Sequence, residues 1–297
     1  RIGGGAAPGL QLAATLGRAV DLGEWRTAAA VAGIKVPADL MDAILAEKVA
    51  VSTPSGFAFD SELLRESLLR QAEEGGDGVR WHDACVRMLR ATRSHRRGVA
   101  ERLGRHLVHA ARPDEALDPL YRGAQERISD GDFRGAAGVL ELRRMALGPR
   151  PALSRARVDQ AVLESDVQRR VGRLDAAASC ADEALTGARA LADLPREAAA
   201  LRMAGEVARN RGDFASARAL LEESARLLEG SPYNTDYGWT LLSWSDAAMR
   251  GGDLDAAMEI VTTGRRLAAD CGDPLDTGRF EMGLGRVARS RGLHREA

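Results

Sequence analysis

Arginines crowd one short stretch of the sequence, where they could bind an anion. Nine arginines lie between Arg80 and Arg112, against only Asp83 and Glu101, in a chain whose formal net charge is −1. A guanidinium offers paired N–H donors that suit phosphate and carboxylate groups. We predict an interdomain or anionic contact here, carried by Arg87, Arg90, Arg93 and Arg97 together with Arg65.

The alternative interpretation of this stretch is a solvated helix face. Aromatic residues that would stack on nucleic-acid bases are not interleaved with the arginines, so a nucleic-acid partner is possible but ranks below a protein or a small acidic effector.

Other reactive side chains do not assemble into a recognisable site. His106 and His109 lie one helical turn apart, but no further ligand follows at metal-binding spacing. The sequence contains neither G-x-x-x-x-G-K-(S/T) nor H-R-D-x-x-x-x-N, and no nucleophile with a base. We therefore predict no catalytic residue, cofactor or metal in this chain, and hence a non-enzymatic role.

Composition favours an α-helical protein outside the membrane. Apolar residues make up 45% of the 297 residues, aromatic residues only 4%, and proline is sparse. The three cysteines are far apart, as in a reducing compartment, and neither an apolar run of about 18 residues nor a signal peptide is present. We predict a cytoplasmic location.

A repeated pattern organises the rest of the chain. It consists of glycine, a large apolar residue two places on, and alanine five places on, and it begins at Gly131, Gly172, Gly212 and Gly252. A weaker copy, with His294 in the apolar place, begins at Gly292. The steps are 40 or 41 residues, which predicts a stacked array of similar units.

Each repeat also has the chemistry of two helices joined by a turn. The glycine can end one helix in a left-handed conformation, and a following aspartate can cap the next helix. A small residue lies seven places before each glycine, as at Ser165, Gly205 and Ser245, and with the alanine it predicts close helix contact. We expect turns at Gly131, Gly172, Gly212 and Gly252.

This spacing resembles the tetratricopeptide repeat (TPR), lengthened from its usual 34 residues. The resemblance implies a right-handed superhelical array of helix pairs over residues 79–297, incomplete at its C-terminal end. The fold class predicted for the whole chain is mostly α.

A smaller domain is predicted over residues 1–78. Two helical segments are followed by two short extended runs about a Pro-Ser-Gly turn and then a further helix, which is the order of a winged helix. Its predicted core consists of Trp25, Leu40, Ile44, Phe57 and Phe59.

The end of this domain resembles the segment after the ATPase module in bacterial signal-transduction ATPases of the STAND type. The family motif is Phe-x-His-x-Leu-(Leu or Ile)-Arg-Glu, and it is matched here by Phe59, Leu63, Leu64, Arg65 and Glu66. Ser61 occupies the place of the motif's histidine, which in the family can sense bound nucleotide. The resemblance implies that this chain is a regulatory fragment and that an ATPase domain precedes it.

In TPR arrays the first helix of each pair lines a groove through positions 13, 10, 6 and 3 before the turn glycine, which form one stripe. A positive groove around a tryptophan suits an acidic ligand with an apolar group. The predicted groove residues are Arg202, Glu206, Arg209, Trp239, Leu242, Asp246, Met249, Arg279, Met282, Arg286 and Arg289.

The predicted function is non-catalytic recognition of a protein, peptide or small effector within a multidomain signalling ATPase. Two alternatives remain open: a nucleic-acid-binding regulator that uses the winged helix and the arginines, and a stand-alone TPR scaffold.

Overall fold

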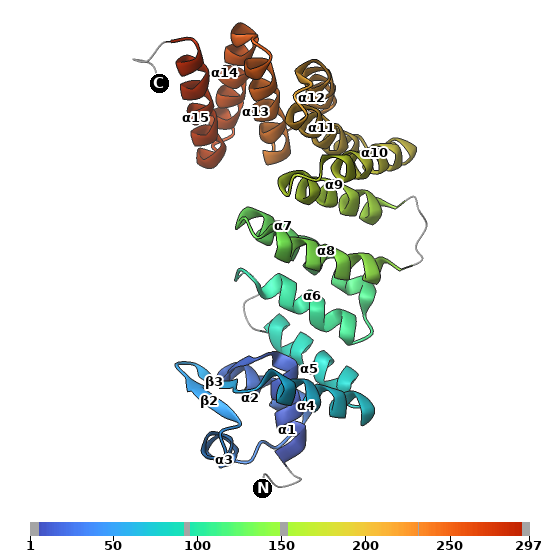
Figure 1. The fold of residues 1–297 in the computed structure, drawn as a ribbon, viewed down its shortest axis with the longest axis vertical. Helices are drawn as coiled ribbons and strands as arrows, with labels where there is room; N and C mark the ends of the chain where they lie inside the picture. Colours follow the sequence, from blue (N-terminus) through green and yellow to red (C-terminus); the bar gives the residue numbers. More distant parts are fainter. Residues whose placement is uncertain (1–5, 92–95, 149–153, 231, 293–297) are drawn as a thin grey trace. The chain divides into compact units, whose positions relative to one another are not determined.

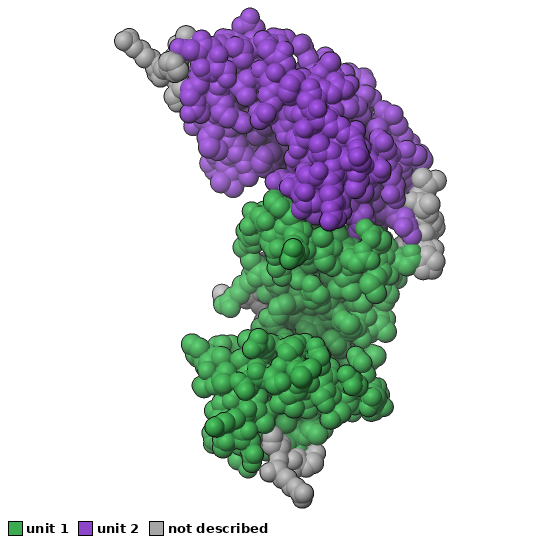
Figure 2. All heavy atoms as spheres, in the orientation of Figure 1, with its two compact units in different colours: residues 1–148 green, residues 149–297 purple. Residues whose placement is uncertain are grey.

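The chain consists of two compact units, residues 1–148 and residues 149–297 (Figure 2). The computed structural model describes residues 6–91, 96–148, 154–230 and 232–292. The division falls inside the predicted array, and the predicted domain boundary near residue 78 stays a prediction.

Unit 1 begins with a small mixed domain (Figure 1). Its elements are α1 (Ala7–Leu16), β1 (Ala19–Asp21), α2 (Leu22–Ala32), α3 (Leu40–Ala46), β2 (Ala50–Thr53), β3 (Gly56–Phe59) and α4 (Glu62–Glu74). The three strands form an antiparallel sheet in the order β1-β3-β2. The two extended runs and the helix after them were predicted, but the structure has three helices and the additional strand β1 before them, where the sequence predicted two helical segments. The winged-helix assignment stays a prediction.

The five predicted core residues of this domain are all buried. Trp25, Leu40, Ile44, Phe57 and Phe59 are each at most 2% exposed. The Trp25 indole N–H donates to the Gly9 carbonyl at 2.9 Å, and its ring meets Phe57 edge-on at 5.3 Å. The tryptophan therefore packs α2 against both α1 and β3.

Helix pairs, followed in unit 2 by the single described helix α15, make up the rest of both units. In unit 1 they are α5 (Gly78–Ala91), α6 (Val99–His109), α7 (Pro113–Ser129) and α8 (Phe133–Leu147). In unit 2 they are α9 (Arg155–Arg170), α10 (Leu174–Ala190), α11 (Leu194–Asn210), α12 (Phe214–Leu228), α13 (Thr235–Arg250), α14 (Leu254–Asp270) and α15 (Pro274–Ser290). The predicted mostly α repeat array is confirmed.

The turns between paired helices follow the predicted chemistry. Gly131, Gly172, Gly212 and Gly252 all have left-handed backbones, with φ from 76° to 90°, which glycine adopts without steric cost. The side chains of Asp132, Asp213 and Asp253 then cap α8, α12 and α14. Helix α10 differs, because Arg173 occupies that position and makes no side-chain cap.

The small residues of each repeat bring the paired helices together. The Ser165 hydroxyl donates to the Ala177 carbonyl at 2.8 Å, and the Ser245 hydroxyl donates to the Ala257 carbonyl at 2.9 Å. At Gly205 an added Cβ would come within 3.3 Å of the Ala217 carbonyl oxygen. The predicted close contact is confirmed.

Replacing Ala217 with Leu should lower the free energy of unfolding by about 1–3 kcal/mol, because the contact has no room for a larger side chain. Ala217 is fully buried against α11, whereas Ala219 on the same helix is exposed. Urea unfolding of both leucine variants checks this. Equal stability of Ala217→Leu and Ala219→Leu would show that the repeated alanine is incidental.

Helices α5 and α6 bury two histidines against each other. The Nδ1 atoms of His82 and His106 lie 2.9 Å apart, so one nitrogen must donate and the other accept. Burial, reinforced by neighbouring charges, lowers the pKa of His82 to about 4 and that of His106 to about 3. Both rings are therefore neutral in the folded protein at pH 7.

This pair should make unit 1 sensitive to mild acid. In the unfolded chain the histidines take up protons below about pH 6.5, whereas in the folded protein they stay neutral down to about pH 4. The free energy of unfolding is therefore highest above pH 6.5 and falls as the pH drops towards 4. Each histidine should lower the free energy of unfolding by about 2 kcal/mol between pH 7 and pH 5. His106→Gln should reduce that loss in urea titrations, and an unchanged pH dependence would contradict the assignment.

Candidate binding surface

The first helices of the pairs in unit 2 form one layer. Helix α11 packs on both α9 and α13, and α13 packs on α15, in addition to the contacts that each makes with its paired second helix. The residue three places before one turn glycine therefore faces the residue six places before the next one. We call the exposed surface of α9, α11, α13 and α15 the first-helix face.

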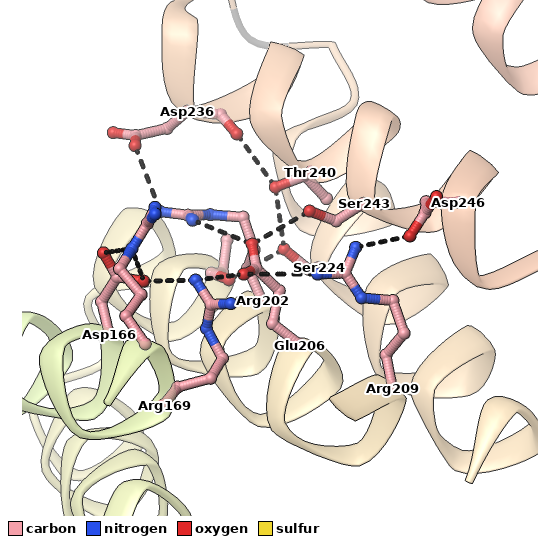
Figure 3. A network of polar contacts seen from close by, with 12 residues as sticks. Asp166, Arg169, Arg202, Glu206, Arg209, Ser224, Asp236, Thr240, Ser243 and Asp246 are labelled. Carbon is pink, nitrogen blue, oxygen red and sulfur yellow. Dashed lines mark hydrogen bonds and ion pairs between the residues drawn. The ribbon is translucent and has the colours of Figure 1, made fainter. Parts of the chain in front are cut away.

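Buried carboxylates link neighbouring first helices (Figure 3). Arg169 Nη2 on α9 lies 2.8 Å from Glu206 Oε2 on α11, and Arg209 Nη1 on α11 lies 2.9 Å from Asp246 Oδ2 on α13. Glu206 also accepts from the Ser243 hydroxyl at 3.0 Å. The side chains of Glu206 and Asp246 are 8% and 6% exposed. Each first helix is thus tied to the next by an ion pair.

Glu206 is charged in the folded protein. Its burial alone would raise the pKa, but the charges of Arg169, Arg202 and Arg209 outweigh that effect, so the pKa of this carboxyl lies below its usual value. Its stabilising contribution is therefore present above the ordinary carboxylate pKa and is lost as the pH falls through the lowered one.

Positive charge exceeds negative charge in this network. Six arginines contact three carboxylates with little exposure, namely Asp166, Glu206 and Asp246. The arginines are Arg169, Arg170, Arg202, Arg209, Arg250 and Arg286. Arg202 also reaches the exposed Asp236 at 3.6 Å. The predicted groove residues Arg202, Arg209 and Arg286 therefore form ion pairs within the array.

Trp239 and its neighbours form the apolar part of the first-helix face. The ring is 41% exposed and carries the Arg279 guanidinium 4.7 Å from its centroid. On α15, Met282 is 67% exposed and the side chain of Arg286 is 49% exposed. An exposed tryptophan under an arginine is typical of residues that dominate binding interfaces.

The remaining predicted groove residues differ in how far they reach the surface. Leu242 is 8% exposed and belongs to the core around Val261 and Phe280. Met249 is half-buried, and its sulfur accepts from the Ser290 hydroxyl at 3.5 Å. Arg289 is exposed on α15. Leu242 therefore supports the face from below and is not part of its open surface.

The arginines of unit 1 have partners within that unit. Arg87 lies 2.5 Å from Asp83, Arg90 lies 2.8 Å from Glu115, and Arg97 lies 2.5 Å from Asp130. Arg65 donates to the Ala14 carbonyl at 3.2 Å and pairs with Glu62. Arg93 lies outside the described residues. These contacts link α4 to α1 and α5 to α7, and they leave less positive charge unpaired than the sequence count implies.

Sequence reasoning missed one pocket of this surface. A hollow of about 330 Å³ lies at the C-terminal ends of α9, α11 and α13, and it is lined by Arg169, Gly172, Leu174, Arg209, Asn210 and Arg250. Arg169 stands three places before Gly172, as Arg209 does before Gly212. The spacing rule that selected Arg209 would have found Arg169.

The described residues offer no other obvious chemistry. They contain no group of three or more histidine, cysteine or acidic side chains that could hold a metal. None of the described helices is long and apolar enough to cross a membrane.

Comparison with known proteins identifies the fold. No protein-family model matches the chain, and no curated protein sequence matches it. Among solved structures, the Rap protein complexed with competence and sporulation factor aligns with a TM-score of 0.53 at 14% identity, over 86% of this chain and 85% of that one. This chain has the fold of TPR-like helical repeat proteins.

A second similar structure comes from Pyrococcus horikoshii. It is a signal transduction ATPase with numerous domains (STAND) that has a tetratricopeptide repeat sensor, and it aligns with a TM-score of 0.52 at 10% identity. The match covers 99% of this chain and 49% of that one, so the present chain spans about half the length of that protein.

Removing the charge of Glu206 should destabilise unit 2. Glu206→Gln leaves three arginines around a neutral amide in a buried place, at an expected cost of about 3 kcal/mol at pH 7. Urea unfolding measures this, with Glu222→Gln on the exposed side of α12 as the matched control. If both variants are equally stable, the network is dispensable.

Proposed function

We propose that this chain is a protein-interaction module whose first-helix face in unit 2 binds a partner segment that is acidic and carries an apolar side chain. The observation that carries the proposal is the exposed Trp239 with Arg279 stacked over its ring. Large aromatic surface left in water is costly unless a partner covers it, and tryptophan and arginine are enriched among residues that dominate binding.

Charge supports an acidic partner. The Arg279 guanidinium lies over the Trp239 ring, and Arg286 on the same helix has a side chain that is 49% exposed. Each arginine also pairs with a carboxylate, Arg279 with Asp276 and Arg286 with Asp246. A positive surface speeds the encounter with an acidic segment and disfavours a basic one. Met282, exposed on α15, offers an adaptable apolar contact on the same helix as Arg279.

A second, broader proposal places this module inside a cytoplasmic bacterial signalling ATPase of the STAND type. The support is the resemblance of residues 59–66 to that family and an alignment with a STAND structure along nearly the whole chain. In that setting the chain binds its partner without catalysing a reaction, and binding biases an ATPase domain carried elsewhere in the protein. The nucleic-acid alternative has less support, because α3, the recognition helix of a winged-helix domain, exposes Asp42 and is flanked by Asp39 and Glu47.

Trp239→Ala should weaken binding of an acidic, leucine- or phenylalanine-containing peptide library by about 2 kcal/mol or more, because the variant removes the apolar anchor. Arg286→Glu should slow association and reduce its dependence on salt, with folding intact. Biolayer interferometry with immobilised protein at two salt concentrations measures both effects.

The matched control is Arg266→Glu, which makes the same charge change on the exposed side of α14. Equal weakening by Arg266→Glu and Arg286→Glu would show a nonspecific charge effect. Preference for a lysine- and arginine-rich library, or full binding by Trp239→Ala, would refute the proposed face.

A further inference from the structure

The pocket at the C-terminal ends of α9, α11 and α13 has walls of one charge. Three of its six lining residues are arginines, Arg169, Arg209 and Arg250, and Asn210 adds an amide. No acidic residue is among these described lining residues. The carboxylates that pair with the arginines, Glu206, Asp246 and Asp166, lie outside the lining.

One of these arginines is buried with unused hydrogen-bonding capacity. The Arg169 side chain is 9% exposed, and its Nη2 contacts Asp166 and Glu206. Its Nε is buried and has no hydrogen-bond partner. A buried N–H group without an acceptor is unfavourable, so an acceptor or a water molecule at this end of the pocket would be stabilising.

The turn that forms another wall is also unusual among the repeats. Gly172 and Leu174 line the pocket, and Leu174 is the first residue of α10. Helices α8, α12 and α14 begin with an aspartate cap, whereas α10 begins with Arg173 and no side-chain cap. An aspartate at that turn would add a negative charge beside the pocket, and this repeat has an arginine instead.

We propose that this pocket binds the phosphate group of a small phosphorylated molecule. A phosphate offers several acceptor oxygens to guanidinium and amide donors, and arginine forks match its geometry. The volume of about 330 Å³ exceeds what a lone ion needs and lies at the lower end of small-molecule pockets. The ligand would span Arg169 and Arg209 at the bottom and Arg250, whose side chain is 58% exposed, at the rim. This site is separate from Trp239 and does not rest on the proposed peptide binding.

The test is calorimetric titration of the full chain with inorganic phosphate and with glycerol 3-phosphate at low salt. Saturable binding with one site is expected, with glycerol 3-phosphate tighter than phosphate. Arg250→Gln and Asn210→Asp should each weaken it about tenfold, because one removes a charged donor and the other adds a repelling charge. Circular dichroism verifies that both variants are folded.

Two controls separate this site from general charge effects and from the peptide face. Arg266→Gln on α14 and Trp239→Ala should both leave phosphate affinity unchanged. Binding that does not saturate, or that Arg266→Gln weakens as much as Arg250→Gln does, would overturn the proposal. Tighter binding of a phosphoserine peptide than of glycerol 3-phosphate would contradict the small-molecule assignment. The absence of phosphate binding would not bear on the peptide-binding measurements at Trp239, and the absence of peptide binding would not bear on the phosphate titration.

Discussion

The close approach of two small residues in each helix pair is the constraint on which the array depends. Where the first is serine, its hydroxyl bonds the carbonyl of the alanine on the paired helix, as Ser165 does with Ala177 and Ser245 with Ala257. Where it is Gly205, the helix backbone itself approaches Ala217. Because the contact fixes each pair at short distance, the first helices of successive pairs in unit 2 lie in one layer, and their side chains meet at regular spacing.

The regular spacing explains the ion pairs. Arg169 with Glu206, and Arg209 with Asp246, are each 37 residues apart, and so are Arg196 and Asp159. In the first two of these pairs, a residue three places before one turn glycine meets a residue six places before the next. Buried charges of this kind contribute little net stability when paired but are costly when one partner is lost, so they specify the register between helices more than they add stability.

The sequence was sufficient for features that depend on local chemistry. Turn glycines, their aspartate caps and the buried core of Trp25, Phe57 and Phe59 follow from residue type and spacing, and the structure confirms them. Features that depend on distant partners were not predictable. Three arginines between Arg80 and Arg112 pair with carboxylates that are between 25 and 78 residues away, which a local count of charge cannot reveal. They are Arg90 with Glu115, Arg97 with Asp130 and Arg102 with Glu24.

Leu242 shows the same limit for apolar residues. Its position in the stripe predicted an open groove, but Val261 and Phe280 from the neighbouring helices surround it. Trp239, at another position of the same stripe, is 41% exposed, and its ring contacts the Arg279 guanidinium of α15. The face available to a partner is therefore decided by the next helix as much as by the stripe itself.

The central claim is that partners bind the layer of first helices in unit 2. Hydrogen–deuterium exchange of the full chain, with and without the acidic, apolar peptide pool, tests it most directly. Slower exchange confined to α13, α15 and the adjoining part of α11 is the predicted result. Protection of α10, α12 and α14 with none on the first helices would contradict the account.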